Sequence, residues 1–418
     1  MKKDTIWTRN FICTMCANLC LSLSHTSVNT LVSTYAAHLG AGAILVGTLT
    51  GIFFGVAVLT RPLTGPLIPK YDNRKLMIIA YALGVVVNAG YAATGSIGAF
   101  LAFRVINGLQ YGTIGVLNLT VASNSLPKSK IGSGVGIFGL SNSVAAAVGP
   151  TIGISLKTLG TAVGGETTGF HLVFIFASSI MALALIPAFL LLPEVKQKGG
   201  IDISAPWHKK IITIHALPST AMIMLVMMSY TLYSAYMVPY AASKGISGIS
   251  AFFTVSALIM IVIKPLSGRL TDRFGFLSII IPAALSLALS LIIVSQTKSI
   301  SGMLIGAVFA AIGQGSLYPA LQTMGIQTET RARRGVASNT LFFGIDLGFF
   351  LGPLFGSIVY SRFDYSSMYM TAVLPCVLML AVLFYAWPRY KKRRSELDAG
   401  ESEEPVSIAG MLSEADDK

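Results

Sequence analysis

Asp346 is the residue in this sequence best placed to do chemistry, because a carboxylate is rare deep within a long apolar segment. It stands eleven positions into the apolar run 335–360, and we find no other carboxylate as deep in any such run. Loss of contact with water favours the neutral carboxyl group, so Asp346 could exchange a proton for a cationic ligand or pass protons alone. The alternative is a structural ion pair, for which Arg104 is the evident basic residue at comparable depth.

Four polar residues follow one face of the apolar run 11–37. Their spacing of i, i+4, i+7 and i+11 aligns the side chains along a helix: Asn18, Ser22, His25 and Asn29. Polar groups in hydrocarbon are costly unless they meet a partner or water, so this stripe is expected to line a cavity. Hydrogen bonding between helices is the alternative. His25 titrates in the physiological range, so it is a second candidate for proton transfer or else a hydrogen-bonding member of the stripe.

Aromatic and amide side chains are aligned in two later apolar runs, 216–242 and 301–325. Aromatic faces with a few amides suit a large, partly apolar organic ligand, including a cation held over rings. Tyrosines near the ends of a run could instead lie at the membrane surface. The full set of predicted cavity residues is Asn18, Ser22, Asn29, Asn107, Tyr111, Asn142, Tyr233, Tyr236, Gln314, Tyr318, Asn339 and Phe343.

The elements that position these residues are predicted to lie in a membrane. Of the 418 residues, 54% are hydrophobic and 11% are charged, with a mean hydropathy of +0.72, whereas soluble proteins carry roughly 25% charged residues. Apolar runs long enough to cross a ~30 Å hydrocarbon core recur along the chain. We therefore predict an all-α polytopic membrane protein with twelve spans: 11–37, 44–68, 76–95, 98–124, 132–157, 171–192, 216–242, 248–268, 277–295, 301–325, 335–360 and 367–387.

The net charge of +13 does not indicate nucleic-acid binding, because Lys and Arg collect in every second loop and at both ends. This pattern places both termini in the cytoplasm of a cell-membrane protein. The first span is long and leads directly from a polar start, so we expect it to stay as an anchor. The predicted units are an N-terminal six-helix bundle, a cytoplasmic linker with a short interfacial helix near Trp207, a C-terminal six-helix bundle and a disordered tail: 1–192, 193–215, 216–390 and 391–418.

The two predicted bundles are related by an internal repeat. Arg61-Pro62-Leu63-Thr64-Gly65 recurs as Lys264-Pro265-Leu266-Ser267-Gly268, an offset of 203 positions. At the same offset Gly149-Pro150 and Gly153 recur as Gly352-Pro353 and Gly356, while the counterpart of Asp346 is Ser143. Many secondary transporters consist of two such repeats that rock about a site between them, so the repeat favours transport.

The loop after 248–268 carries Gly268, Asp272, Arg273 and Gly275, and the span 132–157 carries Gly136, Gly149, Pro150 and Gly153. The first-half loop keeps Gly65 but has Pro69 at the position equivalent to Asp272, with Asp72 and Arg74 following. With these spans and motifs, the sequence resembles the major facilitator superfamily over nearly its full length, and in particular its 12-span drug:proton antiporters. The resemblance implies a gate at the two loops, with Asp72 as a substitute for the acidic residue in the first half, and a proton-coupling role for Arg104. It also implies helix packing at the antiporter signature of the span 132–157.

These observations favour an exporter of small organic molecules that works by proton antiport and alternating access. A proton-coupled uptake symporter or facilitator on the same fold is the alternative, because a fold does not determine direction. An enzyme would need a metal cluster, a nucleophile with a base, or paired carboxylates, and we find none of these in the sequence. Cys13, Cys16 and Cys20 lack a fourth ligand and are assigned to packing. We expect no cofactor and no metal, a monomer, and a small organic substrate with protons as partners.

Overall fold

The computed structural model describes residues 5–41, 43–193 and 211–402, and this part is helical throughout, without strands. The N-terminal half contains α1 (Arg9–Asn29), α2 (Val32–His38), α3 (Ala43–Lys70), α4 (Asn73–Ala93), α5 (Ile97–Asn124) and α6 (Ile131–Leu190). The C-terminal half contains α8 (Leu217–Ser243), α9 (Ser250–Phe274), α10 (Leu277–Gln296), α11 (Ile300–Ile326), α12 (Arg334–Arg362), α13 (Tyr365–Thr371) and α14 (Val373–Ser402). Three-residue 3₁₀ turns precede α6 and α12, at Lys128–Lys130 and Arg331–Arg333.

The predicted twelve-span, all-α membrane fold is confirmed. Nine helices of the described chain are long and apolar enough to cross a membrane, and one of them holds two predicted spans. That helix is α6, which doubles back at Gly164 and Gly165; Gly165 has a φ of 85°, which favours a residue without a Cβ atom. Helices α3 and α5 correspond to the two remaining predicted spans, 44–68 and 98–124.

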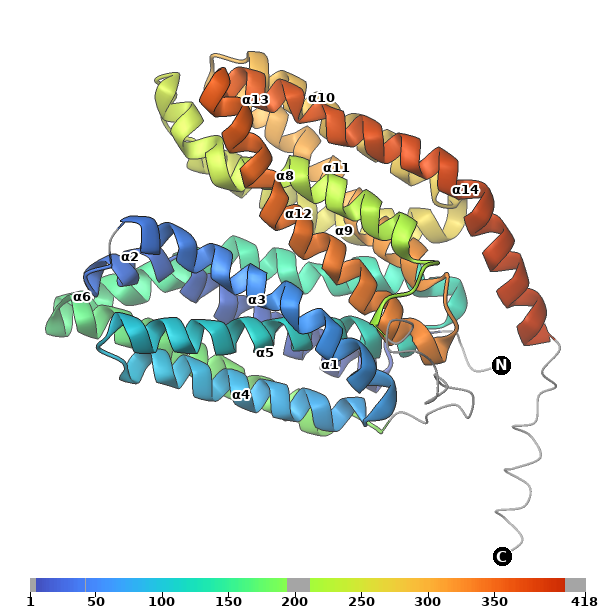
Figure 1. Ribbon diagram of the computed structural model, residues 1–418, viewed down its shortest axis with the longest axis horizontal. Coiled ribbons are helices and arrows are strands. Elements are labelled where there is room, and N and C mark those ends of the chain that lie inside the picture. Colours follow the sequence, from blue (N-terminus) through green and yellow to red (C-terminus); the bar gives the residue numbers. More distant parts are fainter. Residues whose placement is uncertain (1–4, 42, 194–210, 403–418) are drawn as a thin grey trace, which may run out of the picture.

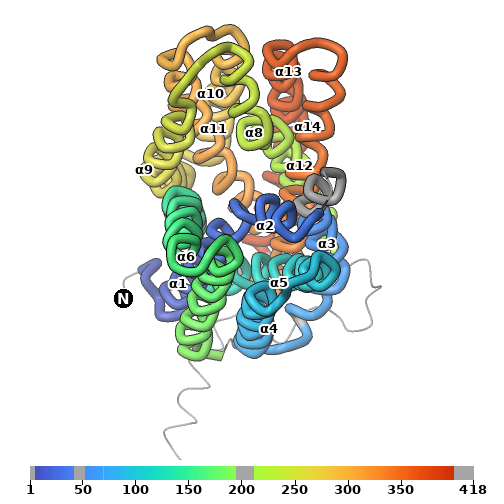
Figure 2. The backbone as a smooth tube through the Cα atoms, turned by 90° about the vertical axis from the view of Figure 1, so that its left-hand side faces the viewer, coloured from blue at the N-terminus to red at the C-terminus, as the bar shows by residue number. Residues whose placement is uncertain are grey.

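The halves form two bundles that meet toward one end of the molecule (Figure 1). Viewed from the side, α6 lies against α9 and α3 lies near α12 (Figure 2). Smaller contacts between the halves join α5 to α12 and α11 to α6. The ribbons approach one another where α12 begins and diverge toward α2 and α13 (Figure 1). We refer to the α3–α12 and α6–α9 contacts as the two crossings.

Three predicted elements have other bounds in the structure. The predicted last span, 367–387, is interrupted at Ala372, between the end of α13 at Thr371 and the start of α14 at Val373. The first span is interrupted, because α1 ends at Asn29 and α2 begins at Val32, with Thr30 bonding back to Thr26. The tail, predicted to be disordered from 391, continues α14 as far as Ser402. Ion pairs one helical turn apart stabilise this extension, such as Arg394–Asp398 at 3.3 Å. The predicted interfacial helix near Trp207 lies outside the described residues.

Glu329 organises the end of the C-terminal half where the halves meet. Its buried carboxylate accepts a hydrogen bond from Thr213 and lies 3.0 Å from His215, both at the end of the linker. Arg333 and Arg393 approach the same carboxylate at 3.4 and 3.8 Å. One side chain thereby joins the segment before α8, the α11–α12 loop and α14. We call this group of contacts the Glu329 cluster; it consists of Thr213, His215, Glu329, Arg333 and Arg393.

Candidate functional site

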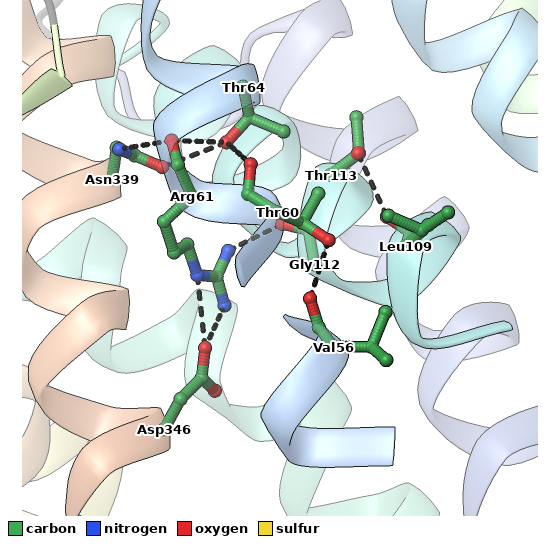
Figure 3. A network of polar contacts seen from close by, with 9 residues as sticks. All are labelled: Val56, Thr60, Arg61, Thr64, Leu109, Gly112, Thr113, Asn339 and Asp346. Atoms are coloured by element: carbon green, nitrogen blue, oxygen red, sulfur yellow. Dashed lines mark hydrogen bonds and ion pairs between the residues drawn. The ribbon is translucent and has the colours of Figure 1, made fainter. Parts of the chain in front are cut away.

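The α3–α12 crossing contains a buried ion pair between the two halves (Figure 3). Arg61 of α3 donates from Nε and Nη2 to Oδ2 of Asp346 in α12, at 3.0 and 2.6 Å. Its third nitrogen donates to the carbonyl of Gly112, and its guanidinium lies 4.9 Å from the ring centroid of Phe342. Arg61 is 1% exposed and Asp346 is 2% exposed. Because both charges are removed from water, the two side chains depend on each other.

The partner of Asp346 therefore differs from the basic residue that the sequence offered. Arg104 stays within the N-terminal half, where it donates to Asn29 Oδ1 at 2.7 Å and lies 4.3 Å from the ring centroid of Phe53. In the sequence, Arg61 stands out only as the first residue of the repeated segment 61–65. Its signal was the repeat itself, which places a basic residue one helical turn before Gly65 and before Gly268.

Amide and hydroxyl groups extend the α3–α12 crossing beside the ion pair. Asn339 accepts from Thr64 at 2.9 Å and donates to the backbone carbonyls of Arg61 and Ile211, both at 3.0 Å. Asn339 is expected to line a cavity, but its side-chain amide instead forms hydrogen bonds that hold the two halves together. Phe343 is half-buried in the same helix turn as Phe342.

The α6–α9 crossing uses backbone groups instead. Asp272, at the end of α9, accepts from the backbone nitrogens of Gly132 and Ser133 at 2.9 and 2.6 Å. It therefore caps the start of α6 in the other half, where a carboxylate is favoured. A Cβ atom on Gly268 would lie 2.3 Å from the carbonyl oxygen of Gly132, and one on Gly136 would lie 2.4 Å from that of Lys264. Only glycine permits this approach.

The other residues of the loop motifs have local contacts. Gly275 ends α9 with a φ of 83°, and Arg273 lies 5.1 Å from the ring centroid of Phe274. Asp72 caps its own helix by accepting from the Arg74 nitrogen at 3.0 Å, and Arg74 donates to the Phe189 carbonyl. Asp72 therefore does not take over the role that Asp272 has across the crossing. Gly65 is buried in α3.

Two glycines of the antiporter signature, Gly149 and Gly153, pack against α1, whereas Gly136 packs against α9. A Cβ atom on Gly149 would lie 2.0 Å from Thr26 Oγ1, and one on Gly153 would lie 2.5 Å from the Ser27 carbonyl oxygen. Pro150 lies within the helix between these two glycines. The segment thus sets how closely α1 and α6 approach within the N-terminal half.

Most of the polar stripe on α1 forms hydrogen bonds between helices. Asn18 donates to Ser141 Oγ and Asn142 Oδ1 at 2.6 and 2.9 Å, and it accepts from Asn118 at 3.0 Å. Ser22 donates to the same Asn142 oxygen at 2.6 Å. For Asn18 and Ser22 the alternative of hydrogen bonding between helices therefore describes the structure, and Asn142 takes part through its Oδ1 atom.

His25 lies between two aromatic rings inside the N-terminal half. Its ring centroid is 4.9 Å from that of Phe53 and 4.6 Å from that of Tyr111, with both rings stacked. His25, Asn107 and Tyr111 border a cavity of about 10 Å³, which is space for about one water molecule. This cavity lies within one bundle and is too small for an organic ligand.

The tyrosines of α8 also pack within their own half. The hydroxyl group of Tyr233 lies 2.7 Å from Ser290 Oγ in α10, and Tyr236 donates to the Pro353 carbonyl at 2.9 Å. Tyr233 is buried in the bundle and does not line a cavity between the halves. On α11, Gln314 is buried with an unbonded Oε1 atom, and the ring centroid of Tyr318 lies 6.0 Å from Lys264 Nζ.

Two helical bundles joined by a buried ion pair and by glycine-lined contacts have the architecture of a secondary transporter. The chain belongs to the Major Facilitator Superfamily, whose family model matches residues 14–298 and 221–414. It is a membrane transporter, not an enzyme.

The chain is similar to multidrug resistance proteins over almost its whole length. It is 25% identical to MdtG of Escherichia fergusonii over 411 residues, which cover 93% of this chain and 96% of that protein. It is 24% identical to MdtG of Salmonella heidelberg over 414 residues, which cover 94% and 98%.

Solved structures share the fold. The human organic anion transporter MFSD10 (TETRAN) has a TM-score of 0.78 at 18% identity, covering 90% of this chain and 99% of that one. FucP in the outward conformation has a TM-score of 0.75 at 14% identity, covering 90% and 98%.

Proposed function

We propose that this protein exports small organic molecules in exchange for protons, by alternating access. The observation that carries the proposal is the buried Arg61–Asp346 pair, because it joins the two halves through a group that can be neutralised by a proton. A carboxylate that takes up a proton gives up its charge interaction with arginine. Proton binding at Asp346 therefore weakens the α3–α12 crossing.

The polar contacts between the halves extend from the middle of α12, at Asp346, to the end that carries the predicted basic loops, at Asp272 and Arg334. With both termini in the cytoplasm, this end is the cytoplasmic one, and the described conformation faces outward. A proton from outside binds Asp346, the pair separates, and the cytoplasmic side opens. The proton then leaves to the cytoplasm, and a substrate binds before the pair forms again. The protein acts as a monomer in this cycle, because both halves belong to one chain.

The energy of one proton is adequate for export. One charge that moves through 100 mV releases ~2.3 kcal/mol, and a tenfold concentration gradient costs ~1.4 kcal/mol. One proton can thus sustain a gradient of roughly fifty-fold for a neutral substrate. Likeness to the MdtG multidrug resistance proteins supports a drug-like or metabolite substrate and export.

The test is proton movement in liposomes that contain the purified protein and a trapped pH dye. Lipophilic cations, neutral drugs and metal-chelating metabolites are added to wild type, Asp346→Asn and the exposed-tail control Asp398→Asn. We expect substrate-triggered proton movement opposite to the substrate in wild type and in the control, and none in Asp346→Asn. Movement of proton and substrate in the same direction would indicate a symporter. Coupling that survives in Asp346→Asn would move the proton site elsewhere, with His25 as the next candidate.

A further inference from the structure

Lys264 is a cation buried at the α6–α9 crossing. It lies in α9 and is 5% exposed. Its Nζ atom donates to the Gly139 carbonyl of α6 at 3.2 Å and lies 6.0 Å from the ring centroid of Tyr318 in α11. Within the described ranges, no acidic side chain forms an ion pair with it. An ammonium group in such surroundings is unfavourable unless an anion accompanies it.

The internal repeat indicates where that anion belongs. Lys264 is the counterpart of Arg61, and Ser143 is the counterpart of Asp346. The Ser143 hydroxyl donates to the Gly139 carbonyl at 3.4 Å, which is the same oxygen that Lys264 contacts. The α6–α9 crossing therefore has the cation of the other crossing, but a hydroxyl group where the carboxylate would be.

The neighbouring side chains suit an organic ligand. Gln314 lies one turn before Tyr318 on α11, on the same face, and its Oε1 atom has no hydrogen-bond partner in the described part of the chain. An aromatic ring beside a cation and an unused acceptor can hold the apolar part and a donor of a small molecule. Among the residues of the predicted spans whose burial the structure describes, the buried charges also have a positive excess: Arg61, Arg104 and Lys264 against Asp346.

We propose that Lys264 binds the anionic group of the transported molecule, a carboxylate or sulfonate, with Tyr318 against its aromatic part. The substrate class follows with one further step that rests on the proposed proton exchange. An anion at Lys264 would favour a proton on Asp346, so a substrate that displaces this proton also carries a cationic group. The inferred substrate is an aromatic zwitterion.

Three xanthene dyes separate these features: rhodamine B carries a carboxylate and a delocalised cation, its ethyl ester only the cation, and fluorescein only anionic groups. Binding to the purified protein is measured by fluorescence polarisation. Wild type is expected to bind rhodamine B roughly tenfold or more tightly than the ester. Lys264→Gln abolishes this preference, whereas Lys264→Arg and the exposed-loop control Lys298→Gln keep it.

A second variant keeps the test independent of losing the lysine. Ser143→Asp places a carboxylate at the proposed anion position, so rhodamine B should lose its advantage while the ester binds as before. Equal affinity of the acid and the ester in wild type would overturn the inference, as would a preference that survives in Lys264→Gln. Failure of wild type to bind any of the three dyes would also count against it.

Transport of the same dyes distinguishes this inference from the proposed exchange. Lys264-dependent movement of fluorescein together with protons would support the anion site and overturn antiport. Proton exchange that is lost in Asp346→Asn, with acid and ester treated alike by wild type and Lys264→Gln, would support antiport and overturn the anion site.

Discussion

The two crossings occupy equivalent positions in the internal repeat but are held together by different groups. In the α3–α12 crossing, side chains form the contact: Arg61 binds Asp346, and Asn339 binds Thr64. In the α6–α9 crossing, the backbones themselves approach at Gly268, and Asp272 caps the facing helix. An ion pair between the halves responds to a proton, whereas glycine packing responds only to a change in helix position. The proposed proton exchange therefore uses the α3–α12 crossing, and the proposed anion site lies at the α6–α9 crossing, where glycine packing sets how closely the helices approach.

The largest effect on stability is expected from a substitution that breaks the ion pair of the α3–α12 crossing. Arg61→Ala leaves Asp346 buried without a partner, which should destabilise the protein by about 3–5 kcal/mol. The loss of stability relative to wild type should become smaller as the pH falls, because a proton neutralises the unpaired carboxylate of Asp346. Adding Asp346→Asn should restore most of the stability. Thermal unfolding of the purified variants in detergent measures each step.

The control for this experiment is an exposed ion pair. Glu166→Gln removes the partner of Lys157, which lies 3.3 Å away. The cost should be at most about 1 kcal/mol. An equal loss in the control and in Arg61→Ala, or a double variant no more stable than the single one, would contradict the assigned dependence of the two charges.

A smaller effect should follow from separating the backbones of the α6–α9 crossing. Gly268→Val introduces atoms that clash with Gly132, and overpacking of this kind costs about 1–3 kcal/mol. The clash acts on the described conformation, so its population should fall roughly 5- to 150-fold relative to the opened one. Spin labels at the exposed positions Ser129 and Arg269 would report a longer distance. Gly98→Val, where nothing lies within 4 Å of the added Cβ atom, should leave the distance unchanged.

The smallest effect is expected from removing the carboxylate of Asp272 that caps the start of α6. Asp272→Ala loses the acceptor for two backbone nitrogens, which costs about 1 kcal/mol for a typical cap. Asp272→Asn keeps an acceptor and should lie between Ala and wild type in the same label experiment. A shift larger than that of Gly268→Val would mean that the carboxylate, rather than backbone packing, dominates this crossing.

The fold could be predicted because hydropathy and the repeat depend on composition over many residues. The outlier Asp346 could be found for the same reason: one carboxylate in an apolar run is unmistakable. Its partner was not identified, since a linear pattern does not tell which of several basic residues crosses between two bundles. The repeat relates Arg61 to Lys264 but does not reveal that only Arg61 meets a carboxylate.

Helical spacing also could not separate two kinds of buried face. The spacing of Asn18 and Tyr233 correctly places each on one face of a helix, but that face meets neighbouring helices of the same bundle. A face toward a neighbour and a face toward a cavity have the same period. The extension of α14 was missed because its charged residues indicate disorder by composition, although their pairing one turn apart stabilises a helix.

The Glu329 cluster has a mechanical consequence for the rocking of the halves. The linker between them reaches the C-terminal half at Thr213 and His215, where Glu329 ties it to Arg333 and to Arg393 of α14. Tension along the linker is therefore shared among α8, α12 and α14 and does not fall on the first turn of α8 alone. We expect a movement of the linker at Thr213 and His215 to move these three helices together.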